Sequence, residues 1–273
     1  MSSSRGYYFA SQTSRDPCII ISLLDGFVRS GDGCHYFQSQ LKSLNRRTRR
    51  KVLESLVLRP QFFLSDPHTH SRLEATLLTM ELLVRALKSI LLDPMLMEEC
   101  LQLDILSEYS TAFYLFCQLL GNTATTGTRS QKASWRSFFA GLISFSQCVV
   151  LNFVKDRRKA FRIMKCRLVT CALRCMLHID DGIPDKNTAL GFILTDTVNY
   201  LTYSDVYRAV APEYPKDLIA MVRARNISKE VNLSCLRFEQ RFVLALETFD
   251  NRKDIPIHMC SNLKVRYHPD FAR

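Results

Sequence analysis

Apolar residues recur at every third or fourth position along most of this chain, and this spacing restricts its fold more than any other feature. In segment 71–92, one face of a helix would carry Leu73, Leu77, Met80, Val84, Leu87 and Leu91, while most charged residues lie away from that face. Segment 230–249 repeats the pattern with Val231, Cys235, Phe238, Phe242, Leu246 and Phe249. Strand patterns are nearly absent, so the sequence predicts an all-α protein.

The same periodicity predicts further helices between and before these two segments. The longer candidates lie at about 97–120, 132–154, 157–178, 188–202 and 215–225, and the shorter ones at 18–29, 35–45 and 47–58. The connections are short and polar, and none has the length and composition of an interdomain linker. We therefore expect a single domain over 1–273, with a flexible N-terminus at 1–16 and an extended C-terminal tail at 251–273.

Helices joined by short connections pack as antiparallel neighbours, and stacked pairs of such helices form a solenoid. The expected fold is a HEAT-like helical solenoid of roughly eight to ten antiparallel helices. The sequence contains no clear repeat of about 35–47 residues, so this expectation depends on helix lengths and loop spacing.

Composition narrows the class of protein further. Of the 273 residues, 47% are hydrophobic and only 9 are glycine, which excludes a disordered tail and disfavours glycine-rich nucleotide loops. The ten cysteines lie mostly in apolar runs without a CxxC pair, as reduced cytosolic cysteines do. No apolar signal sequence opens the chain. We expect a cytoplasmic protein, with the nucleus as the alternative because the run 46–51 resembles a nuclear localisation signal.

The segment Ser137–Val154 is uncharged over 18 residues, which is close to the shortest length that spans a membrane. It contains the polar residues Ser144, Ser146, Gln147 and Asn152, and bases flank it on both sides. We therefore expect a helix buried in a helical core rather than a membrane span.

Positive charge is concentrated in two stretches. The chain carries 37 Lys and Arg against 26 Asp and Glu, a formal net charge of +11. Residues 42–51 contain six bases and no acid, and residues 155–174 contain eight bases and one acid. Such clusters are typical of surfaces that bind RNA phosphates. The predicted RNA-binding residues are Lys42, Arg46, Arg47, Arg49, Arg50, Lys51, Lys155, Arg157, Arg158, Lys159, Arg162 and Lys165.

The second cluster has a helical spacing that would be costly without a partner. Arg158, Arg162 and Lys165 lie at positions i, i+4 and i+7, where like charges destabilise an isolated helix. RNA phosphates or an acidic protein surface would relieve this repulsion, and a solvated basic face is the third alternative.

One stretch has the opposite sign. Between residues 93 and 108 there are five acids and no base, namely Asp93, Glu98, Glu99, Asp104 and Glu108. We expect this stretch to form an acidic face, separate from the basic clusters, that binds a basic protein partner.

No motif of a known enzyme class is present, including the P-loop, GxGxxG, GxSxG, HExxH and EF-hand patterns. His68 and His70 fit a surface loop better than a metal site, and Asp180, Asp181 and Asp185 fit a turn. Cys166 would point away from Cys171 and Cys175 on a helix, so the three predict buried core rather than a zinc site. Trp135 likewise predicts core rather than a base-stacking platform. We expect a non-enzymatic protein without a metal, cofactor or small-molecule substrate.

Three segments within about 45–250 resemble the MIF4G family, the middle domain of the large eukaryotic translation-initiation scaffold. They are Tyr109–Leu120, the aromatic-rich Trp135–Val154 with its central Gly-Leu-Ile, and Asp217–Arg225 followed by Leu236–Phe249. The resemblance implies a crescent of five helix pairs with surfaces for RNA, a DEAD-box helicase or adaptor peptides. It also implies an adaptor role in mRNA translation, as in the small stand-alone members of that family.

Two shorter segments resemble Bcl-2-type regulators, namely Phe27–Gly33 for the BH3 pattern and Ser134–Val149 for the BH1 region. Their separation of about a hundred residues exceeds that of the Bcl-2 fold. The sequence thus leaves two functions open. The first is an adaptor that binds RNA or a ribonucleoprotein in mRNA translation or processing. The alternative is a protein-only scaffold or regulator, solenoid or Bcl-2-like, that binds acidic partners without nucleic acid.

Overall fold

A computed structural model describes residues 18–66, 69, 72–122, 129–152, 157–178, 186–225 and 227–250. These residues form fourteen α-helices and one short 3-10 helix, with no strand among them. The all-α prediction is confirmed, whereas the expected number of helices was too low. The predicted N-terminal segment 1–16 and C-terminal tail 251–273 lie outside the described residues.

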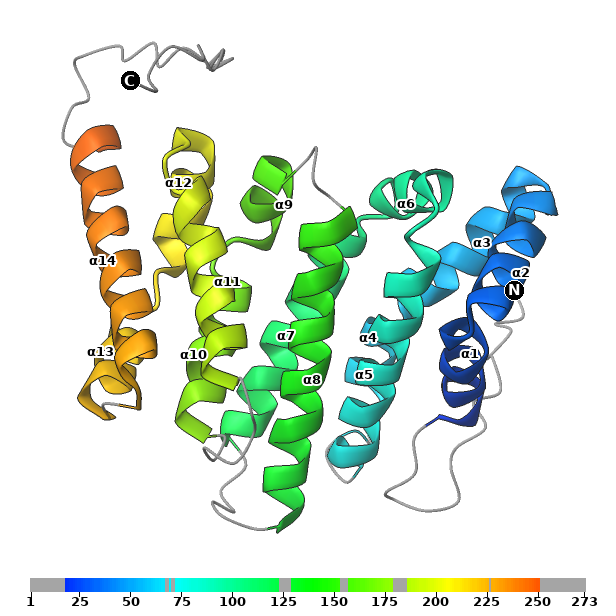
Figure 1. Ribbon diagram of the computed structural model, residues 1–273, viewed down its shortest axis with the longest axis horizontal. Coiled ribbons are helices and arrows are strands. Elements are labelled where there is room, and N and C mark those ends of the chain that lie inside the picture. Colours follow the sequence, from blue (N-terminus) through cyan, green and yellow to red (C-terminus); the bar gives the residue numbers. More distant parts are fainter. Residues whose placement is uncertain are drawn as a thin grey trace, which may run out of the picture.

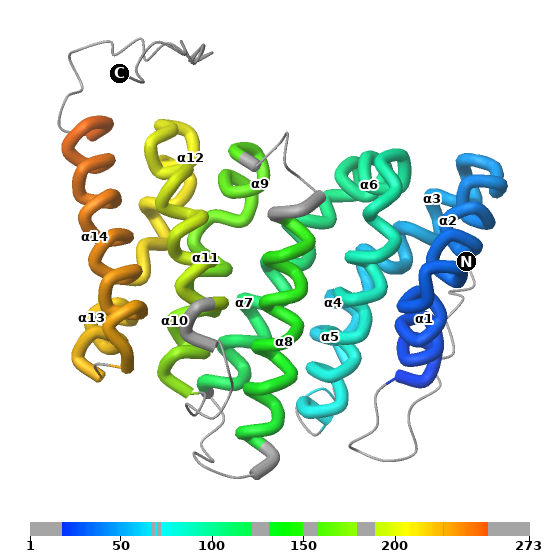
Figure 2. Tube along the Cα trace, viewed as in Figure 1, coloured from blue at the N-terminus to red at the C-terminus, as the bar shows by residue number. Residues whose placement is uncertain are grey.

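A first row of helices, standing side by side, runs the length of the molecule (Figure 1). This first row consists of α1 (Ile19–Arg29), α5 (Leu73–Ile90), α8 (Arg129–Asn152), α11 (Lys186–Tyr200) and α14 (Lys229–Phe249). Each helix of the row packs against the next. The row therefore has two ends, with α1 at one and α14 at the other (Figure 2).

A second row packs against the first. It consists of α4 (Arg59–Ser65), α7 (Ile105–Asn122), α10 (Arg167–His178) and α13 (Lys216–Arg225), and again each helix contacts the next. Three short helices, α6 (Pro94–Leu101), α9 (Arg157–Met164) and α12 (Ser204–Val210), lie along one edge, at the top in Figure 1. The helix α2 (Gly31–Ser43) packs against α1, α3 (Arg46–Val57) packs against α4 and α6, and the 3-10 helix η2 (Ala211–Glu213) follows α12.

The chain visits these positions in a fixed order. A long first-row helix is followed by a short edge helix and then by a second-row helix, in the three units α5-α6-α7, α8-α9-α10 and α11-α12-α13. The first-row helices of these units begin at Leu73, Arg129 and Lys186. The spacing is longer than that of a two-helix repeat, which explains why no repeat of two-helix length is visible in the sequence.

Two of the expected helices are each divided in two. The expected helix at 97–120 is α6 and α7, and the expected helix at 157–178 is α9 and α10. At both breaks a residue adopts the left-handed conformation, Asp104 with φ of 58° and Lys165 with φ of 53°. Neither break is marked by glycine or proline, so the apolar periodicity continues through it. The helices α4 and α12 were not expected at all.

The core lies between the rows and continues within the first row, where α5 packs closely against α8. Phe138, Leu142 and Phe145 of α8 are buried, and Gly141 lets the two helices approach closely, since a Cβ there would lie 3.4 Å from Glu81 Cα. Trp135 is 2% exposed and its ring stacks on His178 at 4.6 Å, so its assignment to the core is confirmed. No helix in the described ranges has the length and apolar character needed to cross a bilayer.

Candidate interaction surfaces

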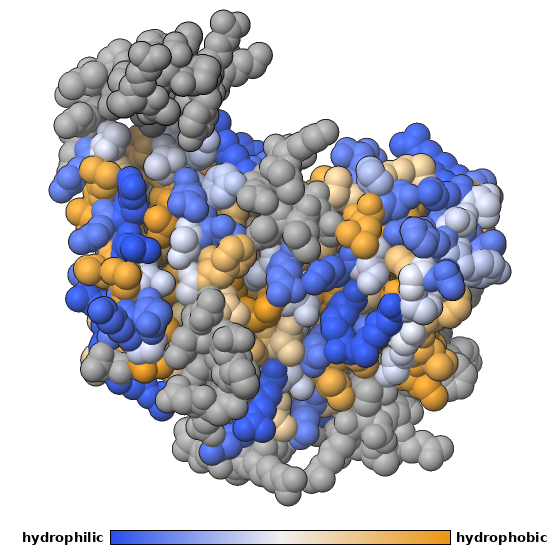
Figure 3. Space-filling model, in the orientation of Figure 1, coloured by the Kyte–Doolittle hydropathy of each residue, from blue (hydrophilic) through white to orange (hydrophobic). Residues whose placement is uncertain are grey.

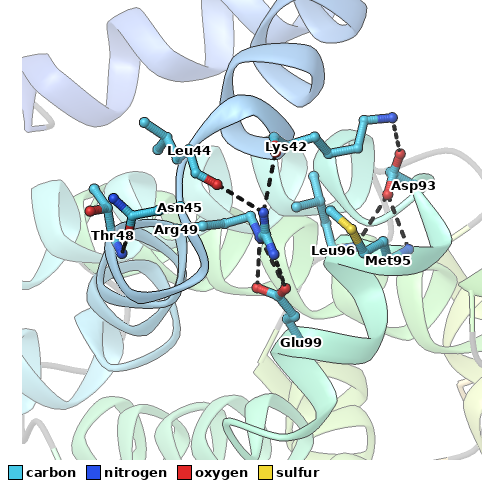
Figure 4. A network of polar contacts seen from close by, with 9 residues as sticks. All are labelled: Lys42, Leu44, Asn45, Thr48, Arg49, Asp93, Met95, Leu96 and Glu99. Carbon is cyan, nitrogen blue, oxygen red and sulfur yellow. Dashed lines mark hydrogen bonds and ion pairs between the residues drawn. The ribbon is translucent and has the colours of Figure 1, made fainter.

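The first basic cluster lies at a corner where α2, α3 and α6 meet (Figure 4). Two side-chain caps fix the ends of the helices there. Asn45 Oδ1 accepts a hydrogen bond from the Thr48 N–H at 2.9 Å and starts α3. Asp93 Oδ1 accepts from the N–H groups of Met95 and Leu96 at 3.0 and 3.2 Å and starts α6. Asn and Asp are favoured at such positions because their oxygens satisfy the first free N–H groups of a helix.

Two bases of the cluster form ion pairs with the acidic stretch. Arg49 Nη2 lies 2.7 Å from Glu99 Oε1, and Arg49 Nε donates to both carboxylate oxygens at 3.0 and 3.1 Å. Lys42 Nζ lies 2.7 Å from Asp93 Oδ2. The expectation of a separate acidic face was therefore wrong at these positions, because α3 and α6 are neighbours.

Arg49 also ties α2 to α3. Its Nη1 donates to the backbone carbonyls of Lys42 and Leu44 at 3.2 and 3.1 Å, at the C-terminal end of α2. The hydrogen bond from Arg49 to Glu99 raises the pKa of the guanidinium further above its ordinary value. Arg49 and Glu99 are largely buried, with side chains 11% and 16% exposed, so this pair is structural rather than free for a ligand.

The Asp93 carboxyl has opposing influences on its pKa. Burial raises it, but the hydrogen bond from Lys42 and those from the Leu96 and Met95 N–H groups lower it more. The net pKa lies below the ordinary value for aspartate. Asp93 is therefore ionised whenever the protein is near neutral pH, and it serves as both cap and ion-pair partner.

Four bases of the first cluster remain exposed: Arg46, Arg47, Arg50 and Lys51. None of them forms an ion pair with any acid in the described part of the chain. They lie in the first two turns of α3, which has no acid in its first turn. Bases at the N-terminal end of a helix oppose the helix dipole, so this arrangement costs stability unless an anion is bound.

The second basic cluster is largely paired within the protein. Arg158 Nη2 lies 2.6 Å from Asp205 Oδ1, Arg162 lies 3.7 Å from the same carboxylate, and Lys165 Nζ lies 3.0 Å from Glu213 Oε1. Arg158 also stacks over the Tyr203 ring at 4.6 Å. Carboxylates of α12 and η2 thus relieve the repulsion, for which RNA phosphates or an acidic protein surface had been considered as partners. Lys159 is exposed, while Lys155 and the Arg157 side chain lie outside what the structure describes.

The remaining acids of the stretch 93–108 do not gather into one site. Glu98 and Asp104 are exposed and Glu108 is half-buried. Asp104 occupies the break between α6 and α7. Asp93 and Glu99 are paired with Lys42 and Arg49. Of the acids expected to bind a partner, only the exposed Glu98 and Asp104 are therefore accessible to one.

The residues considered for metal or acid–base chemistry give no site in the described part of the chain. Cys166, Cys171 and Cys175 are fully buried, which confirms their assignment to the core. Within the described ranges no group of three or more His, Cys, Asp or Glu side chains converges. His68, His70, Asp180, Asp181 and Asp185 lie outside the described residues.

A further surface was missed by the sequence analysis. An open groove of about 600 Å³ lies between α13 and α14, and exposed leucines of α14 line it. The signal in the sequence was that α14 has apolar residues on more than one face, including Leu233, Leu236, Val243 and Leu244. A helix with apolar residues on more than one face is expected to pack against something on each of those faces.

Comparisons with known proteins suggest no function for these surfaces, so their function is inferred from their chemistry. The likeness of the sequence to the MIF4G family remains a prediction. The chain matches no family model, no curated protein and no solved structure.

Proposed function

We propose that this protein is a non-enzymatic helical adaptor that binds RNA or a ribonucleoprotein in mRNA translation or processing. The observation that carries the proposal is the set of four exposed bases on α3, Arg46, Arg47, Arg50 and Lys51, with no ion-pair partner in the described chain. The other two bases of the cluster, Lys42 and Arg49, are used to hold α2, α3 and α6 together.

The chemistry of the α3 surface fits a phosphate backbone. Three of its four bases are arginines, whose planar guanidinium groups can donate two parallel hydrogen bonds to one phosphate. The first N–H groups of a helix favour a negative charge in the same place. A run of phosphates would therefore relieve both the repulsion among the bases and their opposition to the helix dipole.

The arrangement of helices supports an adaptor. We propose that the two rows form a HEAT-like solenoid, whose units contact chiefly their neighbours and leave extended surfaces for partners. The α3 surface lies at the N-terminal end of the rows, and the α13–α14 groove lies at the C-terminal end (Figure 1). Two surfaces at opposite ends can hold two partners at once.

The test compares two variants that remove the same charge from exposed bases at opposite ends of the protein. R46Q/R50Q removes two bases from α3, and R237Q/R241Q removes two from α14. RNA affinity is measured by fluorescence anisotropy with a single-stranded oligonucleotide over a range of salt concentrations. We expect R46Q/R50Q to weaken RNA binding at least about tenfold. The slope of the logarithm of the binding constant against the logarithm of the salt concentration should become shallower by about 1.4, because two phosphate contacts are lost. R237Q/R241Q is expected to change neither.

An equal effect of both variants would show that only net charge matters, and wild-type affinity of R46Q/R50Q would exclude the α3 surface. The second candidate function is a protein-only scaffold. It is favoured by the pairing of Arg158 and Arg162 with Asp205, since these bases already bind a protein carboxylate. A partner that stays bound after nuclease treatment, with no retention of the protein on RNA, would support that candidate instead.

A further inference from the structure

The last helix of the first row has an outward face that nothing in the described chain covers. The inward face of α14 is buried through Val231, Cys235, Phe238, Phe242 and Ala245, where it packs against α11, α12 and α13. The opposite face carries four exposed apolar side chains, Leu233 at 42%, Leu236 at 36%, Val243 at 49% and Leu244 at 50%. Apolar side chains are visible along α14 at the left margin of Figure 3.

The spacing of these residues is that of a helix-binding seam. Leu233, Leu236, Gln240 and Val243 follow alternating steps of three and four, the pattern by which one helix packs along another. Stacked helical proteins normally end in a helix with a polar outer face, which keeps the end of the stack soluble. Because α14 instead presents leucines, its outer face is suited to contact a further helix.

The groove beside this seam supplies a pocket for apolar anchors. It is about 600 Å³ in volume, and its lining includes Ala220, Leu233 and Leu236. An ion pair between Arg223 of α13 and Glu239 of α14 joins the two helices that form it. A mainly apolar groove beside a helix is the usual site for the apolar face of an amphipathic helix.

The margins of the seam are basic. Lys229, Arg237 and Arg241 are exposed and form no ion pair with acids of the described chain. Arg237 and Arg241 lie four residues apart, where their like charges repel. The acids of α14 offset these bases only in part. Glu239 is paired with Arg223, while Glu230 and Glu247 are exposed, so three unpaired bases stand against two exposed carboxylates.

We propose that the α13–α14 surface binds an amphipathic helix of a partner protein whose apolar stripe is flanked by Asp and Glu residues. The apolar stripe would occupy the seam and groove, and the acids would face Lys229, Arg237 and Arg241. The surface lies on other helices than the α3 bases, so the proposal does not depend on RNA binding.

Charge disfavours two of the three occupants that this chain itself could supply. The C-terminal segment 251–273 carries five Lys and Arg against two Asp, so it would meet the basic margin with like charge. Two copies that paired through α14 would bring Arg237 and Arg241 of both copies together. The exposed apolar face of α1 in a second copy, with Ile19, Leu23 and Phe27, is the remaining competitor.

The test is a display library of amphipathic helices with random charged positions, selected against the full-length protein. We expect the selected helices to have leucine-type residues at three- and four-residue spacing and acidic flanks. Synthetic peptides of the selected sequences should bind L236D/L244D at least about tenfold more weakly than wild type. R237Q/R241Q should weaken the same peptides and R46Q/R50Q should not, which distinguishes this site from the α3 surface.

Selected helices with basic or neutral flanks, or equal binding to L236D/L244D, would overturn the proposal. Both substituted leucines are exposed, so the variant is expected to keep its helical circular dichroism. Self-association in sedimentation experiments that is abolished by either L236D or L23D would also overturn it, because a second copy would then be the occupant.

Discussion

Arg49 Nη2 lies 2.7 Å from Glu99 Oε1, and this contact joins the basic stretch 42–51 to the acidic stretch 93–108. The two stretches are about fifty residues apart in the sequence, yet α3 and α6 are packed against each other. Part of the uneven charge of this chain is therefore used to hold the N-terminal end of the molecule together.

The first prediction concerns the geometry of this pair. We expect R49K to lower the melting temperature by about 2–4 °C, nearly as much as R49A, because a lysine cannot donate to Glu99 and to the α2 carbonyls together. E99Q should have a smaller effect, since an amide still accepts one hydrogen bond. Thermal unfolding followed by circular dichroism measures this, and full stability of R49K would show that a single charge is sufficient.

The sequence predicts the charges and the helices that form this pair, but not which residues are paired. The opposite signs of the two stretches are visible in the sequence, and so is the helical character of each. Which residue faces which is not visible, because it depends on how α3 and α6 cross. For the same reason Lys42, Arg49, Arg158 and Arg162 were assigned to RNA, although carboxylates of the protein lie beside them.

The second prediction concerns a more deeply buried carboxylate. Asp25 of α1 is 3% exposed and lies 2.9 Å from both Arg29 and Arg85, so it links α1 to α5. We expect D25A to lower the free energy of unfolding by about 1–2 kcal/mol, because Arg85 then keeps only its contact with Glu81, at 3.1 Å. R29A should cost less than about 1 kcal/mol, since the Arg29 side chain is 55% exposed.

Urea unfolding of both variants measures this difference. Equal losses for D25A and R29A would show that the contact between α1 and α5 depends on apolar packing and not on the carboxylate.

The third prediction concerns pH. The pKa of Asp93 is lowered in the folded protein, so its ionised form stabilises the fold above the pKa of the unfolded chain, about 4. This contribution is lost as the pH falls through the lower folded pKa. We expect D93N, which keeps a capping oxygen, to cost about 0.5–1 kcal/mol at pH 7 and to match wild type in strong acid.

Urea unfolding of wild type and D93N at pH 7 and at about pH 2 supplies the comparison. A difference that stays constant across this range would mean that Asp93 acts only as a cap and that its pairing with Lys42 adds nothing.

The fourth prediction uses two glycines in helices with opposite surroundings. A Cβ at Gly141 would lie 3.4 Å from Glu81 Cα and from the Phe113 ring, whereas a Cβ at Gly26 would meet no atom within 4 Å. We expect G141L to destabilise the protein by about 2–3 kcal/mol, since α5 and α8 would have to move apart. G26A should stabilise it by about 0.5–1 kcal/mol, because alanine has a higher helix propensity than glycine at an exposed position within a helix. If G141L left the free energy of unfolding unchanged, α5 and α8 could move apart at this contact without loss of stability.

The helix breaks are the part of the fold that sequence patterns could not reveal. The apolar spacing of 157–178 continues across Lys165, and lysine is a good helix former, so a single helix is the natural prediction. In the structure α9 ends at Met164, and Lys165 takes the left-handed conformation with its N–H bonded to the Phe161 carbonyl at 3.0 Å. The break turns the chain from the edge helix α9 into the second row, so tertiary packing decides the local structure here.

The last prediction follows from that conformation. Glycine is favoured just after a helix end because it adopts the left-handed region without steric cost. Lys165→Gly and Lys165→Ala both remove the ion pair with Glu213, so their difference isolates the backbone. We expect the glycine variant to be more stable than the alanine variant by about 1 kcal/mol. Inside a continuous helix the order would be reversed, because glycine there costs about 1 kcal/mol relative to alanine. Urea unfolding of the two variants therefore decides by its sign whether 157–178 is two helices or one.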